Sequence, residues 1–237
     1  GELYPLAGDA GVWPNGFPFP PRDVPLRLSP MSRFVTPRGE AGAAHMADGY
    51  ARAGRGRGAV FTSTGPAAAN AMPGLMESLL ACSPVLHFTG QTATAHLGKD
   101  QGATHDLPKQ QQMLAAVSKA TFRIMSADTA LETLRAAVSA ALTPPRGPVS
   151  IEIPIDIQRS TMRRPNSINP APAWVAPRSS EADVRQIADM VRKARKPLIW
   201  VGSGALASAD PIRRLLDLGF GLVTSWSGRG VVSEADD

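Results

Sequence analysis

Short apolar runs alternate with stretches of helical spacing along the middle of this chain. Residues 59–63, 85–89 and 148–153 are runs of about the length of buried strands, and β-branched residues recur in them. Residues 67–80 and 127–142 repeat small or aliphatic side chains every three or four positions, as amphipathic helices do. Strands that alternate with helices predict an α/β fold with a doubly wound, mostly parallel sheet.

A single carboxylate stands out at the start of this pattern. The short β-rich run Phe34–Thr36 stops at Pro37, Glu40 follows, and helical spacing begins immediately after it. We therefore expect Glu40 at a strand-to-helix junction, where the unpaired N–H groups and the dipole of the helix favour an acidic group. An ordinary first-turn glutamate would satisfy the same pattern.

The pattern also divides the chain into parts. Residues 1–30 are irregular and rich in Pro and Gly, residues 31–160 carry the α/β pattern, and residues 161–180 are a Pro/Ser/Asn-rich linker. Residues 181–237 begin a second α/β unit with two predicted helices and two predicted strands. Two strands and two helices cannot cover both faces of a parallel sheet, so we expect this second domain to be partial and the chain to be a fragment.

Proline and glycine residues within the α/β region predict where individual helices and strands end. Pro73-Gly74 predicts a boundary or kink inside the helical stretch 67–80. Gly90-Gln91 is expected to end a strand, and residues 92–112 are expected to form a polar loop.

Composition excludes several classes of protein. The 237 residues are 43% hydrophobic with a net charge of +5, and the abundant Ala and Gly favour closely packed α/β layers. The basic residues form no run and do not interleave with aromatic residues, which argues against nucleic acid as a partner. No apolar stretch reaches the roughly 18–20 residues of a membrane span, and the first residues lack the pattern of a signal peptide, so none is expected. Cys82 is the only cysteine, so a disulfide within the chain is excluded, and we expect a cytoplasmic protein.

Five segments in a fixed order carry a resemblance to a known family. They are Pro37–Arg52, Thr64–Asn70 (Thr-Gly-Pro-Ala-Ala-Ala-Asn), Ser83–Gln91, Ser118-Lys119, and Arg146–Asp156. Together they resemble the thiamine-diphosphate-dependent decarboxylases and carboligases of the acetolactate (acetohydroxyacid) synthase type. Residues 31–160 are similar to the pyrimidine-binding domain of that family, and residues 181–237 are similar to the opening of its central domain.

The resemblance implies roles for individual residues. In the family, the glutamate at the position of Glu40 hydrogen-bonds a pyrimidine nitrogen of the cofactor and promotes the tautomer that takes the proton from the thiazolium ring. A carboxyl with this task needs a dry pocket, where burial would raise its pKa. The turn Thr64, Gly65 and Pro66, with Asn70, is implied to line the cofactor pocket, and it leaves the carboxyl end of a parallel strand. Gln91 and His105 are implied to face the substrate, although an exposed loop histidine is an equal alternative for His105.

Two positions depart from the family pattern. Relatives usually carry His immediately before the glutamate, whereas this chain has Gly39. They also usually carry a second glycine after Gly-Pro, whereas this chain has Ala67. The first 30 residues do not resemble the opening strand and helix of the family.

The resemblance further implies a 2-oxo acid substrate such as pyruvate and assembly as a homodimer or homotetramer. Thiamine diphosphate would be bound with Mg²⁺, whose ligands are expected in a separate C-terminal domain that is missing here. FAD binding stays undecided. The 237-residue chain alone is therefore expected neither to bind the cofactor tightly nor to turn over substrate.

Two other interpretations remain open. The chain could be a truncated, non-catalytic homologue that acts as a binding or interaction module, or a gene remnant. It could also be a dinucleotide-binding protein, because Gly202-Ser-Gly204 follows a predicted strand. The third glycine of that fingerprint is absent, since position 207 is Ala, and no acidic residue follows about 20 residues later.

Overall fold

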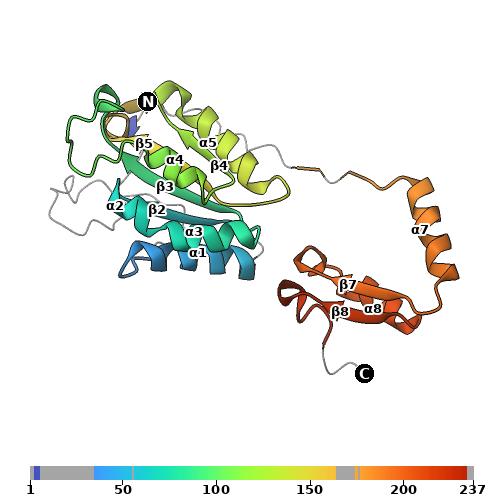
Figure 1. Ribbon diagram of the computed structural model, residues 1–237. Helices are drawn as coiled ribbons and strands as arrows, with labels where there is room; N and C mark the ends of the chain where they lie inside the picture. The colour runs from blue at the N-terminus through green and yellow to red at the C-terminus, as the bar shows by residue number, and fades with distance from the viewer. Residues whose placement is uncertain (1–2, 6–34, 55, 164–173, 176, 234–237) are drawn as a thin grey trace. The chain divides into compact units, whose positions relative to one another are not determined.

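The computed structural model describes residues 3–5, 35–54, 56–163, 174–175 and 177–233 (Figure 1). The chain divides into two compact units, residues 1–174 and 175–237. The division falls inside the predicted linker.

A four-stranded parallel sheet forms the centre of the first unit. Its strands stand in the order β2-β3-β5-β4, and all three pairings are parallel. The bounds are β2 (Gly58–Thr62), β3 (Val85–Gln91), β4 (Ala120–Arg123) and β5 (Val149–Pro154). The predicted α/β fold with a parallel, doubly wound sheet is therefore confirmed.

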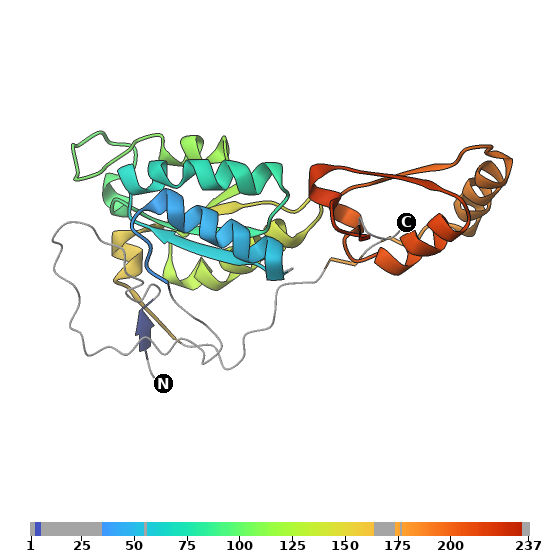
Figure 2. The same ribbon diagram turned by 90° about the horizontal axis from the view of Figure 1, so that it is seen from below.

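Helices cover both faces of this sheet (Figures 1 and 2). α1 (Glu40–Gly54), α3 (Met72–Leu80) and α4 (Gln110–Ala115) pack on one face around Leu75, Val85 and Leu114. α5 (Ala127–Leu142) packs on the other face against Val149 and Ile151. Apolar residues enclose the sheet on both sides, as a parallel sheet requires.

Small residues let α1 approach its neighbours closely. A Cβ added to Gly74 of α3 would lie 2.6 Å from the Cβ of Ala44, and one added to Gly58 would lie 2.1 Å from the carbonyl oxygen of Ala47. Ala44, Ala47 and Ala51 recur on the buried face of α1. The high Ala and Gly content thus has a concrete use in layer packing.

α5 is stabilised at both of its ends. Ser126 is its N-cap, and the Ser126 side chain accepts a hydrogen bond from the Thr129 N–H. At the other end, Lys119 Nζ donates to the carbonyl oxygens of Ala140 at 2.7 Å and Thr143 at 2.5 Å. A cation on the last carbonyls of a helix also interacts favourably with its dipole. Lys119, part of one of the five family segments, thereby joins β4 to the end of α5.

Several boundaries differ from those expected from the sequence. The helical stretch 67–80 is two helices, α2 (Pro66–Asn70) and α3, which meet at Ala71, so the predicted break occurs just before Pro73. β3 continues through Gly90 and Gln91. The predicted loop 92–112 contains a short 3₁₀ turn, η1 (Thr94–His96), and the start of α4.

The expectations for the N-terminal part are only partly within the described residues. Val35 and Thr36 are not in a strand, and Phe34 lies outside the described residues. β1 (Leu3–Pro5) pairs antiparallel with β6 (Thr161–Arg163), whereas both were expected in irregular segments. The remaining residues of 1–30 lie outside the described part of the chain.

The second unit matches the predicted order of elements. It contains α7 (Glu181–Lys193), β7 (Leu198–Val201), η2 (Ser203–Ala205), α8 (Ala209–Asp217), β8 (Gly221–Thr224) and η3 (Trp226–Gly228). β7 and β8 pair in parallel, and Val201 and Ile212 form a small core with Val231 and Val232. Leu198, Trp200 and Val223 are exposed, so one face of this two-stranded sheet is uncovered in the described unit.

Candidate functional site

The sequence-predicted residues gather where the parallel strands of the first unit end. Thr64 and Gly65 follow β2, Gln91 is the last residue of β3, and the short helix α6 (Ile155–Gln158) follows β5. In open α/β sheets this carboxyl edge is where ligands bind. The arrangement of the strands therefore makes this edge the candidate site.

Glu40 is the first residue of α1, as predicted. Its Oε2 accepts a hydrogen bond from Asn70 Nδ2 over 3.4 Å, which joins α1 to the end of α2. Within the described part of the chain, Oε1 of Glu40 has no hydrogen-bond partner. Glu40 is only half-buried, so the described residues by themselves do not form the dry pocket expected around it.

The Gly65-Pro66 turn is held by the loop that carries His105. Gly65 has φ +61°, a conformation that favours glycine, and an added Cβ would lie 2.3 Å from the carbonyl oxygen of His105. Pro66 is the first residue of α2, where its missing N–H costs no hydrogen bond. Since His105 is exposed, it is the backbone of His105, rather than a buried ring, that closes on the turn.

Gln91 is the last residue of β3, and its side chain is buried. It is only 4% exposed, its Nε2 donates to Glu152 Oε1 over 3.3 Å, and its Oε1 accepts from the N–H of Thr92 over 2.7 Å. Both ends of the Gln91 amide are thus bound within the protein. The side chain thereby orients the end of β3, and its implied role towards the substrate stays a prediction.

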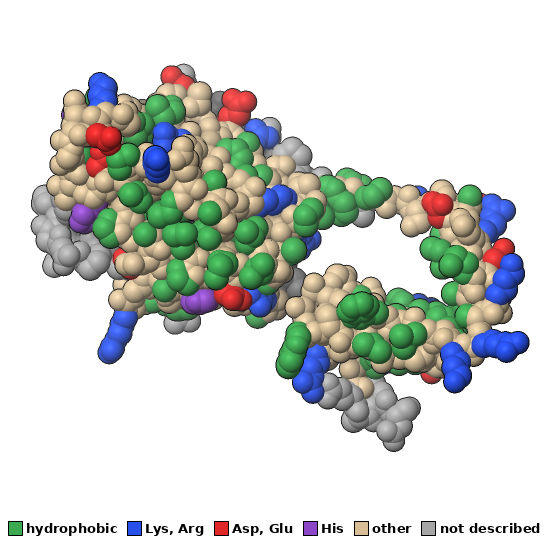
Figure 3. Space-filling view, in the orientation of Figure 1, with side chains coloured by type: hydrophobic (Ala, Val, Ile, Leu, Met, Phe, Trp, Pro, Cys, Tyr) green, Lys and Arg blue, Asp and Glu red, His purple; other side chains and the backbone are tan. Residues whose placement is uncertain are grey.

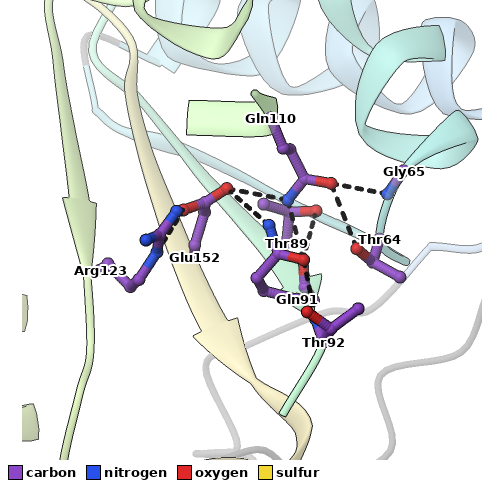
Figure 4. Close-up of polar contacts among 9 residues, drawn as sticks. Thr64, Gly65, Thr89, Gln91, Thr92, Gln110, Arg123 and Glu152 are labelled. Carbon is purple, nitrogen blue, oxygen red and sulfur yellow. Dashed lines mark hydrogen bonds and ion pairs between the residues drawn. The ribbon is translucent and has the colours of Figure 1, made fainter. Parts of the chain in front are cut away.

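Sequence reasoning missed the group at the centre of these contacts, Glu152 of β5. The carboxylate is 0% exposed and forms an ion pair with Arg123 of β4, with its Oε2 2.7 Å from Nε and 2.6 Å from Nη2 (Figure 4). The signal in the sequence was Ile151-Glu152-Ile153, a charge inside an otherwise apolar strand. Buried charges are costly unless they are paired and hydrogen-bonded, so such a position warrants a search for partners.

Gln110, the first residue of α4, was also missed. It is fully buried, its Nε2 donates to Glu152 Oε1 and to the Gly90 carbonyl, each over 3.0 Å, and its Oε1 accepts from the N–H of Gly65 over 2.6 Å. Thr64 Oγ1 donates to the same oxygen over 3.2 Å. Nothing in the run of three glutamines distinguishes Gln110 from its neighbours, because only the fold brings it to the Gly65 turn.

Asp156 of α6 fixes the loop on the other side of Gln91. It accepts hydrogen bonds from the backbone N–H of Thr94 over 3.0 Å and from the Thr94 hydroxyl. Partial burial alone would raise the pKa of Asp156, but the hydrogen bonds from Thr94 and from the backbone of residues 156 and 157 outweigh it and lower the pKa. Asp156 thus stays ionised and anchors η1.

The residues at this edge fit the pyrimidine half of a thiamine cofactor. Glu40 offers one unpaired carboxylate oxygen beside Asn70. An aminopyrimidine presents an amino group that can donate to such an oxygen, and a ring nitrogen that can bind it when the two share a proton. The neighbouring turn is held at a fixed position by Gln110 and His105. In the described residues no group of three or more His, Cys, Asp or Glu could hold a metal ion.

Comparison with known proteins supports the same interpretation. Residues 25–113 match the family described as thiamine pyrophosphate enzyme, N-terminal TPP binding domain. The chain is 29% identical over 222 residues to the mitochondrial acetolactate synthase catalytic subunit of Saccharomyces cerevisiae, covering 87% of this chain and 31% of that protein. It is 29% identical over 221 residues to chloroplastic acetolactate synthase 2 of Nicotiana tabacum, covering 90% of this chain and 32% of that protein. It is 28% identical over 246 aligned residues to the mitochondrial acetolactate synthase of Schizosaccharomyces pombe, covering 95% of this chain and 35% of that protein.

These matches confirm the resemblance to the N-terminal domain of thiamine-diphosphate-dependent enzymes of the acetolactate synthase type. The chain spans about a third of the length of the relatives it matches. Their names place them in mitochondria or chloroplasts, so the cytoplasmic location stays a prediction for this chain. Among the described residues, none of the helices is both long and apolar enough to cross a membrane.

Proposed function

We propose that the first unit, which resembles the N-terminal part of acetolactate synthases, is the pyrimidine-binding half of a thiamine diphosphate site. The observation that carries the proposal is the position of Glu40. It lies at the start of α1 with one carboxylate oxygen bound to Asn70 and the other unpaired among the described residues. A glutamate so placed can share a proton with a ring nitrogen.

Each residue at the edge has a proposed task. Glu40 binds the pyrimidine and exchanges a proton with its ring nitrogen, while Asn70 orients the carboxylate. Thr64, Gly65 and Pro66 form the wall beside it, and His105 is the candidate for the substrate side. When bound, the cofactor supplies an electron sink for loss of carbon dioxide from a 2-oxo acid such as pyruvate.

The exposed surface of α1, the helix that begins with Glu40, and of α3 supports a partner that completes the site. Met46 and Tyr50 of α1 and Met76 and Leu80 of α3 are exposed, and apolar side chains gather on the face where these two helices lie (Figure 3). Contiguous exposed apolar surface is typical of an interaction site. A diphosphate- and Mg²⁺-binding domain docked on this face and extending to the N-terminal end of α1 would bury Glu40 and provide the dry surroundings that proton sharing requires. The proposed assembly is therefore a homodimer or homotetramer in which the two halves of the site meet.

A Glu40→Gln variant tests this function directly. The chain is co-expressed with the protein encoded immediately downstream, and release of carbon dioxide from pyruvate is measured with thiamine diphosphate and Mg²⁺. We expect release by the wild type and a loss of at least about 100-fold in Glu40→Gln, because an amide cannot exchange the proton that general acid–base catalysis needs. Circular dichroism should be unchanged, since Glu40 is only half-buried.

Glu132→Gln is the matched control, because Glu132 is exposed on α5, on the opposite face of the sheet. It should retain full activity. Equal activity of wild type and Glu40→Gln would refute the role of Glu40. Absence of both turnover and thiamine diphosphate binding in the wild-type assembly would favour the non-catalytic homologue instead.

A further inference from the structure

One buried carboxylate lies on the strand next to β3 and contacts residues at the carboxyl edge of the sheet. Glu152 projects from β5, which lies between β3 and β4 in the sheet. Its Oε2 is bound by Arg123, to which it is directly paired in the sheet register. Its Oε1 is therefore the oxygen that remains for the other side, where Gln91 and Gln110 approach.

The charge of Glu152 dictates how both amides are turned. A carboxylate oxygen only accepts hydrogen bonds, so Gln91 and Gln110 must each direct Nε2 towards it. The Oε1 atom of each amide is then turned away from Glu152. For Gln110 this oxygen receives the N–H of Gly65 and the hydroxyl of Thr64.

The second branch works in the same way. Gln91 Oε1 receives the N–H of Thr92, the first residue after β3. Figure 4 shows the two branches diverging from Glu152, one towards Gly65 and one towards Thr92. A single anion thereby fixes the backbone at the ends of both β2 and β3.

We propose that Arg123, Glu152 and Gln110 are positioning residues for the Gly65-Pro66 turn, and that Glu152 also positions the exit of β3 through Gln91. The consequence for cofactor binding rests on the proposed function, whereas the effect on the two backbone amides does not. Stability alone is a poor reason for this ion pair, because buried pairs often stabilise a fold no more than apolar side chains of similar volume. The network instead fixes the orientation of the Gln91 and Gln110 amides, because each donor and acceptor in it has one permitted orientation.

A swap of the two side chains separates positioning from general stability. In Glu152→Gln, the new amide keeps its oxygen on Arg123 and turns its NH₂ towards Gln91 and Gln110. Both glutamines then have to turn over, and the amides of Gly65 and Thr92 lose their acceptors. In Gln110→Glu, the oxygen that replaces Nε2 faces two acceptors, Glu152 Oε1 and the Gly90 carbonyl, so repulsion displaces the side chain and weakens its bond to the Gly65 N–H. The Gln91 branch keeps its acceptor.

The double variant Glu152→Gln/Gln110→Glu restores one branch only. The amide introduced at position 152 can donate to the carboxylate introduced at position 110, whose other oxygen accepts the Gly65 N–H, although the Gly90 carbonyl loses the donor it had in Gln110. Gln91 still meets a donor in place of an acceptor, so Thr92 remains unbound. This pattern, in which Gly65 recovers and Thr92 does not, is one that a uniform change in stability cannot produce.

Amide hydrogen exchange, measured by NMR on the full chain without cofactor, reports on the Gly65 and Thr92 amides at the ends of the two branches. We expect exchange to accelerate about tenfold at Gly65 and Thr92 in Glu152→Gln, at Gly65 alone in Gln110→Glu, and at Thr92 alone in the double variant. Gln112→Glu is the matched control, because Gln112 is an exposed residue two positions further along α4. It should change neither amide.

Unchanged exchange at Gly65 in Gln110→Glu, or a folded double variant in which Gly65 does not recover, would overturn the proposal. If Glu152→Gln fails to fold, Gln110→Glu against Gln112→Glu still decides the Gly65 branch. Calorimetric titration with thiamine diphosphate and Mg²⁺ in the assembled protein tests the consequence, and the dissociation constant should rise about tenfold in Gln110→Glu. If the wild type does not bind thiamine diphosphate, the proposed function is refuted. The exchange rates of Gly65 and Thr92 would still test the positioning role of Glu152 and Gln110.

Discussion

Acid should weaken the first unit through one buried histidine. His87 of β3 is 0% exposed, its Nε2 lies 2.8 Å from the Thr62 hydroxyl, and its Nδ1 lies 3.0 Å from the Ser150 hydroxyl. Desolvation by burial lowers the pKa of His87 from 6.5 to about 3. The imidazole is therefore neutral in the folded protein over the range in which an unfolded chain would protonate it.

The sign and size of the pH effect on the free energy of unfolding follow from proton linkage. Above a pH of about 6.5 neither state binds the proton, and the stability contributed by the neutral ring is fully present. As the pH falls towards 3, only the unfolded state binds it, so the free energy of unfolding decreases by up to about 1.4 kcal/mol per pH unit. Between a pH of about 7 and about 5 the loss attributable to His87 is about 2 kcal/mol.

Urea unfolding of wild type and His87→Asn at these two pH values measures the effect. Far-UV circular dichroism is the suitable signal, because the described tryptophans are at positions 174, 200 and 226, at the end of the first unit and within the second. The wild type should lose about 2 kcal/mol more than His87→Asn between the two pH values. Identical losses in the two proteins would refute the reasoning, whatever their absolute stabilities.

His45→Gln is the control for histidine content. His45 is exposed on α1, so its substitution should leave the pH dependence as in the wild type. A comparable change in both variants would mean that the effect does not come from burial.

Two glycine substitutions test the close approaches in the first unit. Gly65→Ala should cost about 1–3 kcal/mol of unfolding free energy and weaken thiamine diphosphate binding, because the residue has φ +61° and its Cβ would lie 2.3 Å from the His105 carbonyl; wild-type stability and binding would contradict this. Gly74→Ala should destabilise by about 1–3 kcal/mol through overpacking against Ala44, whereas Gly49→Ala, with nothing within 4 Å of its Cβ, should stabilise α1 by about 0.5–1 kcal/mol. Thermal unfolding measures both, and equal shifts for Gly74→Ala and Gly49→Ala would show that α1 and α3 do not constrain each other.

The sequence alone determined the main helices and strands of the α/β region, although β1, β6 and α4 were not predicted. The helix at 127–142 was predicted with the bounds that the structure gives, and the strands at 85–89 and 148–153 were predicted within two residues. Local spacing suffices for this, because each element must bury its own apolar face. The same local information placed Glu40 at the start of α1 and Gly65-Pro66 at a turn.

Only the tertiary structure decided which side chains meet. β5 inserts between β3 and β4, so Glu152 contacts Gln91, 61 residues away in sequence, and Gln110, 42 residues away. These contacts show that Gln91 orients the end of β3, which its position in the sequence did not reveal. Strand order depends on how whole elements pack, and periodicity within one segment carries no information about its neighbours. The sequence therefore specified the main elements and the position of Glu40. The order of the strands specified the hydrogen-bond network around Glu152 that holds the site.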